Sequence, residues 1–138
     1  MARIRTVKPE FFDDEKLATI SLQARLVFIG LLVHSDDYGV VKGHPLWLKN
    51  QILPYDDISL PDFTDLLQEL VTINCIVAFC HSGEQYYHIR KFSEHQKVEK
   101  PSKWRNPEYL EDTPRILPEY SPTSRQKIRN TPRWKGRE

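Results

Sequence analysis

The sequence has no long apolar run. No stretch of the 138 residues approaches the roughly 18 consecutive apolar residues that a membrane-spanning helix needs. The N-terminal residues MARIRTVKPEFFDDEK also lack the apolar segment of a secretory signal peptide. We therefore expect a soluble intracellular protein.

Glycine, cysteine and histidine are scarce, which argues against several catalytic and metal sites. The five glycines form neither a phosphate-binding loop nor a G-x-S-x-G turn. The five histidines and two cysteines show no CxxC, HxxxH or HExxH spacing. We therefore expect that the chain is not an enzyme and holds no metal and no cofactor.

The two cysteines, Cys75 and Cys80, are five residues apart in an expected strand. Because side chains alternate along a strand, the two thiols should lie on opposite faces. A disulfide between them is therefore not expected, and we predict two buried, reduced thiols.

Acidic residues occur in adjacent groups at positions 13–15, 36–37 and 56–57. Neighbouring side chains on a helix or strand point apart, and all three groups fall at expected turns or helix starts. Aspartate side chains accept hydrogen bonds from backbone N–H groups at such places. Capping therefore explains these carboxylates better than acid–base catalysis or metal binding does.

Charge is distributed unevenly, although the net charge is only +1. Residues 1–8 carry three basic and no acidic groups, residues 9–92 carry six basic and twelve acidic groups, and residues 93–138 carry eleven basic and seven acidic groups. The central part of the chain is therefore acidic, and both ends are basic.

Proline is concentrated at the C-terminal end. Six of the ten prolines lie in the last 38 residues, where apolar residues are sparse. Such a composition is typical of a chain that is extended or ordered only locally. We therefore expect one domain over residues 1–100 and an extended or partly disordered basic tail over residues 101–138.

Apolar periodicity predicts the elements of the first half of the domain. A short helix or turn is expected at Pro9–Leu17, and a central buried helix from Leu22 to about His34, capped by Ser21. A short strand is expected at Val40–Lys42. Pro45 then suits the first position of a helix that ends near Leu53.

The second half contains one more long helix and a hairpin. Pro61 begins a helix that ends before Asn74 and turns five apolar residues inward: Phe63, Leu66, Leu67, Leu70 and Val71. Strands at Cys75–Cys80 and Gln85–Phe92 are expected to form a hairpin through the turn HSGE. Ser93 and Gln96 have the spacing of a capping box for a last short helix.

The predicted order is therefore helix, strand, helix, helix, strand, strand. This order indicates an α+β fold and suits a winged helix-turn-helix, in which a three-helix core carries a small antiparallel β-hairpin wing. Another small α+β domain would also fit the same order. The Pro- and Arg-rich tail would follow the wing.

Three spaced blocks of the sequence resemble a known family. RTVKPEFFDDEKLATISLQARLVFIGLLVHSDDYG, HPLWLKNQILPYDD and IRKFSEHQKV are similar to the N-terminal domain of phage and prophage replication proteins, known as replisome organisers or replication initiators. The resemblance implies a winged-helix domain that binds double-stranded origin DNA in the cytoplasm of a bacterial host cell. It also implies a role in recruiting a host replication protein.

Basic residues supply candidate contacts to DNA phosphates. Within the domain these are Arg3, Arg5 and Lys8 in an N-terminal arm, Lys42 and Lys49 around the second helix, and Arg90 and Lys91 after the last strand. The tail adds Arg125, Lys127, Arg129, Arg133 and Lys135, with Trp134 among them. Cations interleaved with an aromatic side chain also suit single-stranded nucleic acid.

The third helix has an acidic outer face, formed by Asp62, Asp65 and Glu69. Three carboxylates without a cation oppose insertion into a DNA groove. The face is then either a solvated surface or a docking surface for a basic protein partner. On the second helix, the side chain of Trp47 should point nearly perpendicular to the direction of the buried side chains. Trp47 then either packs at the margin of the core or contacts a partner.

Two other functions fit the same pattern. The chain could be an adaptor that binds a host protein through the acidic helix, or a winged-helix transcriptional regulator, because a fold does not fix its function.

Overall fold

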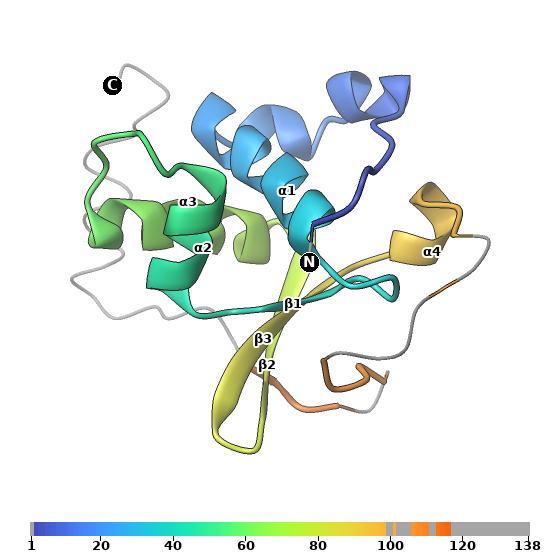
Figure 1. Ribbon diagram of the computed structural model, residues 1–138. Helices are drawn as coiled ribbons and strands as arrows, with labels where there is room; N and C mark the ends of the chain where they lie inside the picture. Colours follow the sequence, from blue (N-terminus) through green and yellow to red (C-terminus); the bar gives the residue numbers. More distant parts are fainter. Residues whose placement is uncertain (1, 99–100, 102–105, 111–112, 117–138) are drawn as a thin grey trace.

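The computed structural model describes residues 2–98, 101, 106–110 and 113–116 (Figure 1). Two short 3-10 helices, η1 (Pro9–Asp13) and η2 (Leu17–Thr19), come first. They are followed by α1 (Leu22–His34), β1 (Val40–Lys42), α2 (Pro45–Ile52), α3 (Leu60–Thr72), β2 (Ile76–His81), β3 (Glu84–Ile89), α4 (Phe92–His95) and β4 (Arg115–Ile116). The chain is therefore α+β, as the sequence predicts, and the predicted element order is observed from α1 to β3.

The strands form one antiparallel sheet in the order β1-β3-β2-β4. Val40 of β1 and Val77 of β2 both pair with His88 of β3. The β2–β3 turn has positive φ at its two central residues, Ser82 (53°) and Gly83 (81°), as a type I′ hairpin turn requires. The predicted hairpin is confirmed, and it projects beyond the helices (Figure 1).

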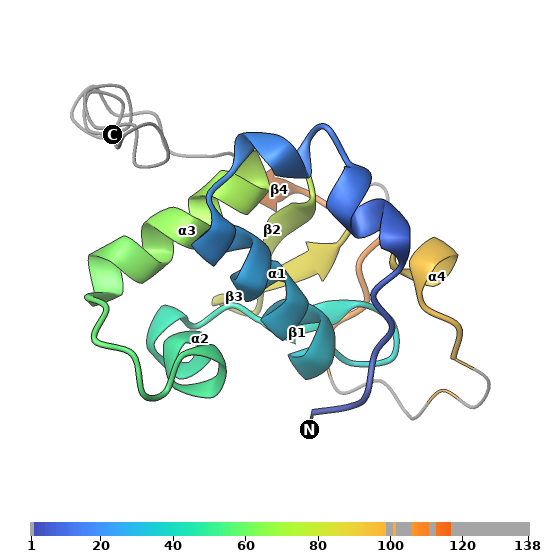
Figure 2. The same ribbon diagram turned by 90° about the horizontal axis from the view of Figure 1, so that it is seen from above.

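The helices pack around α1. Seen from above, α2 and α3 lie on one side of α1 and η1 lies on the other (Figure 2). The core contains Val27 and Leu31 of α1, Phe63 and Leu67 of α3, and Tyr87 of β3, each at most 1% exposed. The expected central helix is α1, with Ala24, Val27, Leu31 and Leu32 buried, but its burial is incomplete, because Leu22 and Leu26 are 73% and 53% exposed.

Side-chain caps account for where the long helices begin. The hydroxyl of Ser21 accepts a hydrogen bond from the N–H of Ala24, and the hydroxyl of Ser59 accepts one from the N–H of Asp62. These bonds satisfy donors that have no partner inside the helix. Asn74 adopts φ 66°, the left-handed conformation that stops a helix.

The last short helix begins differently from the prediction. Lys91, with φ 57°, precedes α4, and Ser93 lies inside the helix and caps nothing. The Gln96 side chain instead binds the N-terminal arm, accepting from the Thr6 N–H at 2.9 Å and donating to the Thr6 carbonyl at 2.8 Å. The predicted capping box is therefore wrong, because Gln96 is drawn into a long-range contact.

The described part of the tail returns to the sheet. Arg115 and Ile116 of β4 pair with β2, and the Asn106 amide donates to the Val40 carbonyl at 2.9 Å. The Tyr109 ring stacks on His88 with 4.4 Å between ring centroids. These contacts cross the domain boundary expected near residue 100, since they tie Asn106, Tyr109, Arg115 and Ile116 to the domain.

Among the residues that the structure describes, no helix is long and apolar enough to cross a membrane.

The Ser59→Ala substitution should lower the free energy of unfolding by about 1 kcal/mol, because the first turn of α3 loses the acceptor for the Asp62 N–H. Ser93→Ala is the matched control, since Ser93 is exposed and caps no helix; it should cost less than about 0.5 kcal/mol. Urea denaturation measures both values. Equal losses in the two variants would contradict the assigned cap.

Candidate nucleic-acid interface

Arg5, predicted as a phosphate contact, is an internal residue. Its guanidinium donates to the carbonyls of Leu32, Ser35 and Asp36, each at 3.0 Å, and to a carboxylate oxygen of Asp37 at 3.2 Å. The Arg5 side chain is only 5% exposed, and that of Asp37 is fully buried. A cation at the C-terminal end of α1 binds carbonyls that lack helical partners. We therefore withdraw Arg5 from the candidate DNA contacts.

The rest of the N-terminal arm, residues 3–8, is also fixed to the domain. The Arg3 N–H donates to the Val33 carbonyl at 2.9 Å, and the Arg3 guanidinium lies 3.5 Å from Asp37. The side chain of Arg3 stays 41% exposed. At the other end of the arm, the Lys8 ammonium donates to the carbonyl of Glu94 in α4 at 3.3 Å. Arg3 and Lys8 therefore remain available at the surface in fixed positions.

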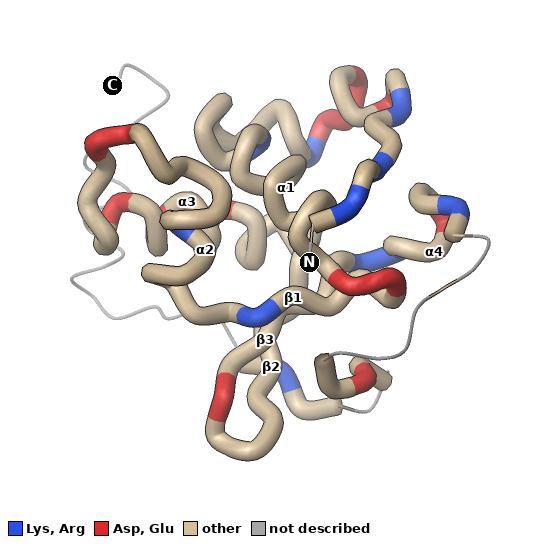
Figure 3. Tube along the Cα trace, in the orientation of Figure 1, with Lys and Arg blue, Asp and Glu red and all other residues tan. Residues whose placement is uncertain are grey.

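The fold brings three of the predicted cations together. Lys8, Arg90 and Lys91 line one cavity of about 370 Å³ between the arm, the end of β3 and α4, and Lys16 lines it with them. Arg90 and Lys91 also border a wider hollow of about 800 Å³, with Lys97 and Arg115. We call Lys8, Lys16, Arg90 and Lys91 the arm–α4 cluster. Figure 3 shows the arm and the segment after β3 in blue on the same side of the molecule.

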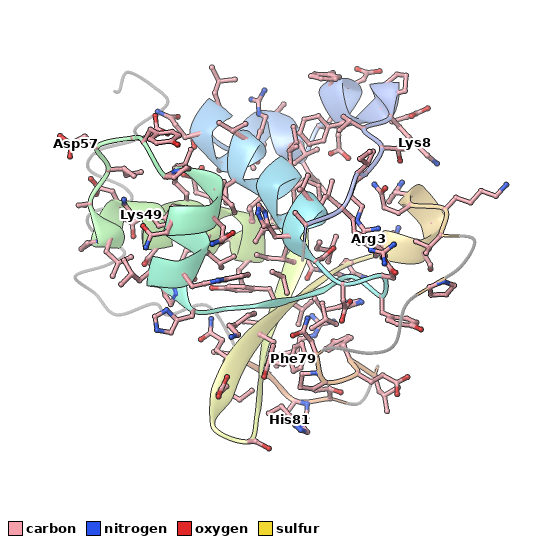
Figure 4. All side chains as sticks on the ribbon, in the orientation of Figure 1. Arg3, Lys8, Lys49, Asp57, Phe79 and His81 are labelled. Atoms are coloured by element: carbon pink, nitrogen blue, oxygen red, sulfur yellow. The ribbon has the colours of Figure 1, made fainter. Side chains whose placement is uncertain are left out.

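Lys42 and Lys49 form a separate group. The Lys42 ammonium lies 5.8 Å from the centroid of the Trp47 ring, a distance at which a cation is attracted to an aromatic face. Trp47 is half-buried against the core and meets His34 edge-on at 6.4 Å. Figure 4 places Lys49 across the molecule from Arg3 and Lys8. The predicted cations of the domain thus divide between two surfaces.

The acidic face of α3 is smaller than the sequence predicts. Glu69 is buried, with 8% of its surface exposed, and its carboxylate accepts from the Ser21 N–H at 2.8 Å and the Ser21 hydroxyl at 3.1 Å. Glu69 therefore ties α3 to the start of α1 and cannot belong to a docking surface. Asp62 is exposed and Asp65 half-buried, so two carboxylates remain on the outer side.

The cysteines differ from each other. Cys80 is exposed and Cys75 partly buried, and neither forms a disulfide. The prediction of a buried thiol is therefore wrong for Cys80, because β2 presents its last residues to solvent. Desolvation by burial raises the pKa of the Cys75 thiol, which lines the cavity of the arm–α4 cluster.

Sequence reasoning missed the roles of Lys16 and Arg115. Lys16 precedes η2 and Arg115 lies in β4. Lys16 lines the smaller cavity and Arg115 the wider hollow, and each meets Arg90 and Lys91 there only because the fold brings distant segments together. No spacing in the sequence marks that arrangement. The five cations proposed in the tail, Arg125 to Lys135, lie outside the described residues.

Within the described ranges, no three His, Cys, Asp or Glu side chains are grouped as a metal site would require. Comparison with known proteins gave no match to a family model, a curated protein or a solved structure.

Proposed function

We propose that this chain is a DNA-binding protein of the phage replication type, built on a winged helix-turn-helix domain. The observation that carries the proposal is the order α1, β1, α2, α3, β2, β3 combined with the sheet order β1-β3-β2. In a winged helix, three helices pack together and the strand after the first helix joins a hairpin that follows the third. The tight β2–β3 hairpin corresponds to the wing.

The positions of the basic residues indicate that DNA would not be bound through the third helix and the wing, as is usual for this fold. Neither the outer face of α3, with Asp62 and Asp65, nor the turn at Ser82 and Gly83 offers a cation. Exposed Lys8 and Lys91 and half-buried Arg90 lie together at the arm–α4 cluster instead. Phosphate neutralisation by such groups is independent of base sequence. In this proposal, the arm–α4 cluster holds the duplex backbone, with Arg3, Lys42 and Lys49 as further contacts.

The tail has a separate place in the proposal. Its cations and Trp134 combine phosphate neutralisation with a surface for base stacking, which suits single-stranded nucleic acid. A replication origin offers both forms of DNA once it opens. The tail, or the surface left by Asp62 and Asp65, would then meet a host replication protein.

Truncation tests whether the domain binds duplex DNA and the tail binds single strands. The chain ending at Ile116 retains β4 and its pairing with β2, so it is a better domain fragment than one that ends near residue 100. Gel-shift titrations at low salt should show that this fragment keeps duplex binding and loses affinity for single strands. Loss of all duplex binding on truncation would contradict the proposal, because it would assign the activity to the tail.

A further inference from the structure

The cavity at the arm–α4 cluster has an apolar floor. It is lined by Leu17 of η2, Leu32 of α1, Ile89 of β3 and Phe92 of α4, which are between 2% and 6% exposed. Phe11 and Phe28 also line it, with their rings stacked at 6.1 Å. Its volume of about 370 Å³ is at the small end of the range of roughly 300 to 1,000 Å³ for small-molecule sites.

The mouth of the same cavity is cationic. Lys8, Lys16 and Lys91 are exposed and Arg90 is half-buried, and all four line the cavity. Two acids, Glu10 and Asp14, line it as well. Asp14 is committed to the backbone, because its carboxylate accepts from two N–H groups of the following turn at 2.8 and 3.1 Å.

This positive mouth contrasts with the rest of the domain. Residues 9–92 hold twelve acidic and only six basic residues, yet three of those six, Lys16, Arg90 and Lys91, line this one cavity. Within the described part of the chain, these three side chains form no ion pair. Four basic side chains against two acidic ones give the lining of the cavity a net positive charge, which raises the local concentration of anions.

We propose that this cavity binds a small amphipathic anion, with its carboxylate or phosphate at the cationic mouth and its apolar body on the floor. Charge complementarity selects the head group, and the buried Leu17, Leu32, Ile89 and Phe92 desolvate the body. A neutral apolar molecule gains only the desolvation of its body, and a bare inorganic anion gains only the attraction to the cations. The site does not depend on whether the protein binds DNA.

Two fluorescent probes with the same aromatic body test the proposal on the full chain. 1-Anilinonaphthalene-8-sulfonate carries an anionic group, and N-phenyl-1-naphthylamine lacks it. The parent protein should bind the sulfonate at one site and more tightly than the neutral probe. Replacing Lys8 and Lys91 together with glutamine should weaken sulfonate binding about tenfold and change neutral-probe binding by less than about twofold.

The matched control removes two cations away from the cavity, through Lys42→Gln and Lys49→Gln, and should leave the affinities for both probes unchanged. Cys75→Phe fills the cavity and should abolish binding of both probes; if this variant does not unfold cooperatively, the lysine variants still decide. Equal weakening by the control pair, or many weak sulfonate sites, would overturn the proposal.

Competition identifies the head group. Decanoate displacing the sulfonate probe indicates a carboxylate ligand, and adenosine monophosphate displacing it indicates a phosphate ligand. Displacement by neither compound overturns the proposal.

Discussion

Replacing Arg5 with alanine should lower the free energy of unfolding by about 3 kcal/mol, as measured by urea denaturation. The substitution removes one donor from the carbonyls of Leu32, Ser35 and Asp36, of which those of Leu32 and Asp36 keep a second donor. It also removes the closer of two cations from Asp37, whose side chain is fully buried. Breaking one partner of a buried ion pair costs about 3 to 5 kcal/mol because an uncompensated charge remains. The remaining contact from Arg3 keeps the expected cost at the lower end.

Two variants separate this role from simple loss of charge. Arg3→Ala removes the same charge from a side chain that is 41% exposed, and it should cost less than about 1 kcal/mol. Arg5→Lys keeps the charge but loses the planar fork that reaches several acceptors, so it should recover only part of the stability. Equal losses from Arg3→Ala and Arg5→Ala would contradict a special structural role for the buried Arg5 side chain.

The Glu69→Ala substitution should lower the free energy of unfolding by about 2 kcal/mol. The Ser21 N–H and hydroxyl both lose their acceptor on Glu69, and hydrogen bonds to a charged group contribute about 1.5 to 3 kcal/mol. Because Ser21 also caps α1, the loss should loosen the contact between α1 and α3. Thermal unfolding and urea denaturation measure the change.

Asp62→Ala is the matched control for Glu69→Ala. Both residues are acids of α3, but Asp62 is exposed in the first turn, where a carboxylate contributes less than about 1 kcal/mol through the helix dipole. A cost for Asp62→Ala as large as that for Glu69→Ala would contradict the burial of Glu69 and would return it to the acidic outer face.

Most of the fold could be predicted because its signals are local. Ser21 and Pro61 mark helix starts, Asn74 marks a helix end, and the Ser82-Gly83 pair marks a two-residue turn, each within a few residues of the element it controls. Such features depend on backbone geometry and capping chemistry that a short window of sequence carries. The bounds of α1 and β1 agree with the predicted residues for this reason.

The candidate site could be predicted only in part, because the partner of each charged residue is set by the whole fold. Arg5 and Lys8 look alike as members of a basic arm, yet only Arg5 meets the carbonyl end of α1 and the buried Asp37. Glu69 has the helical spacing of an outer residue, but the start of α1 covers it with Ser21, 48 positions earlier in the chain. No local pattern carries contacts of that range.

The salt dependence of duplex binding tests whether basic side chains of the domain bind the phosphates of DNA. Without Arg5, six of the candidate cations of the domain remain near its surface: Arg3, Lys8, Lys42, Lys49, Arg90 and Lys91. If each neutralises one phosphate, the logarithm of the association constant for duplex DNA should fall with the logarithm of salt concentration at a slope of about −5. A slope shallower than about −2, or no duplex binding by the full chain at low salt, would contradict phosphate binding by these side chains.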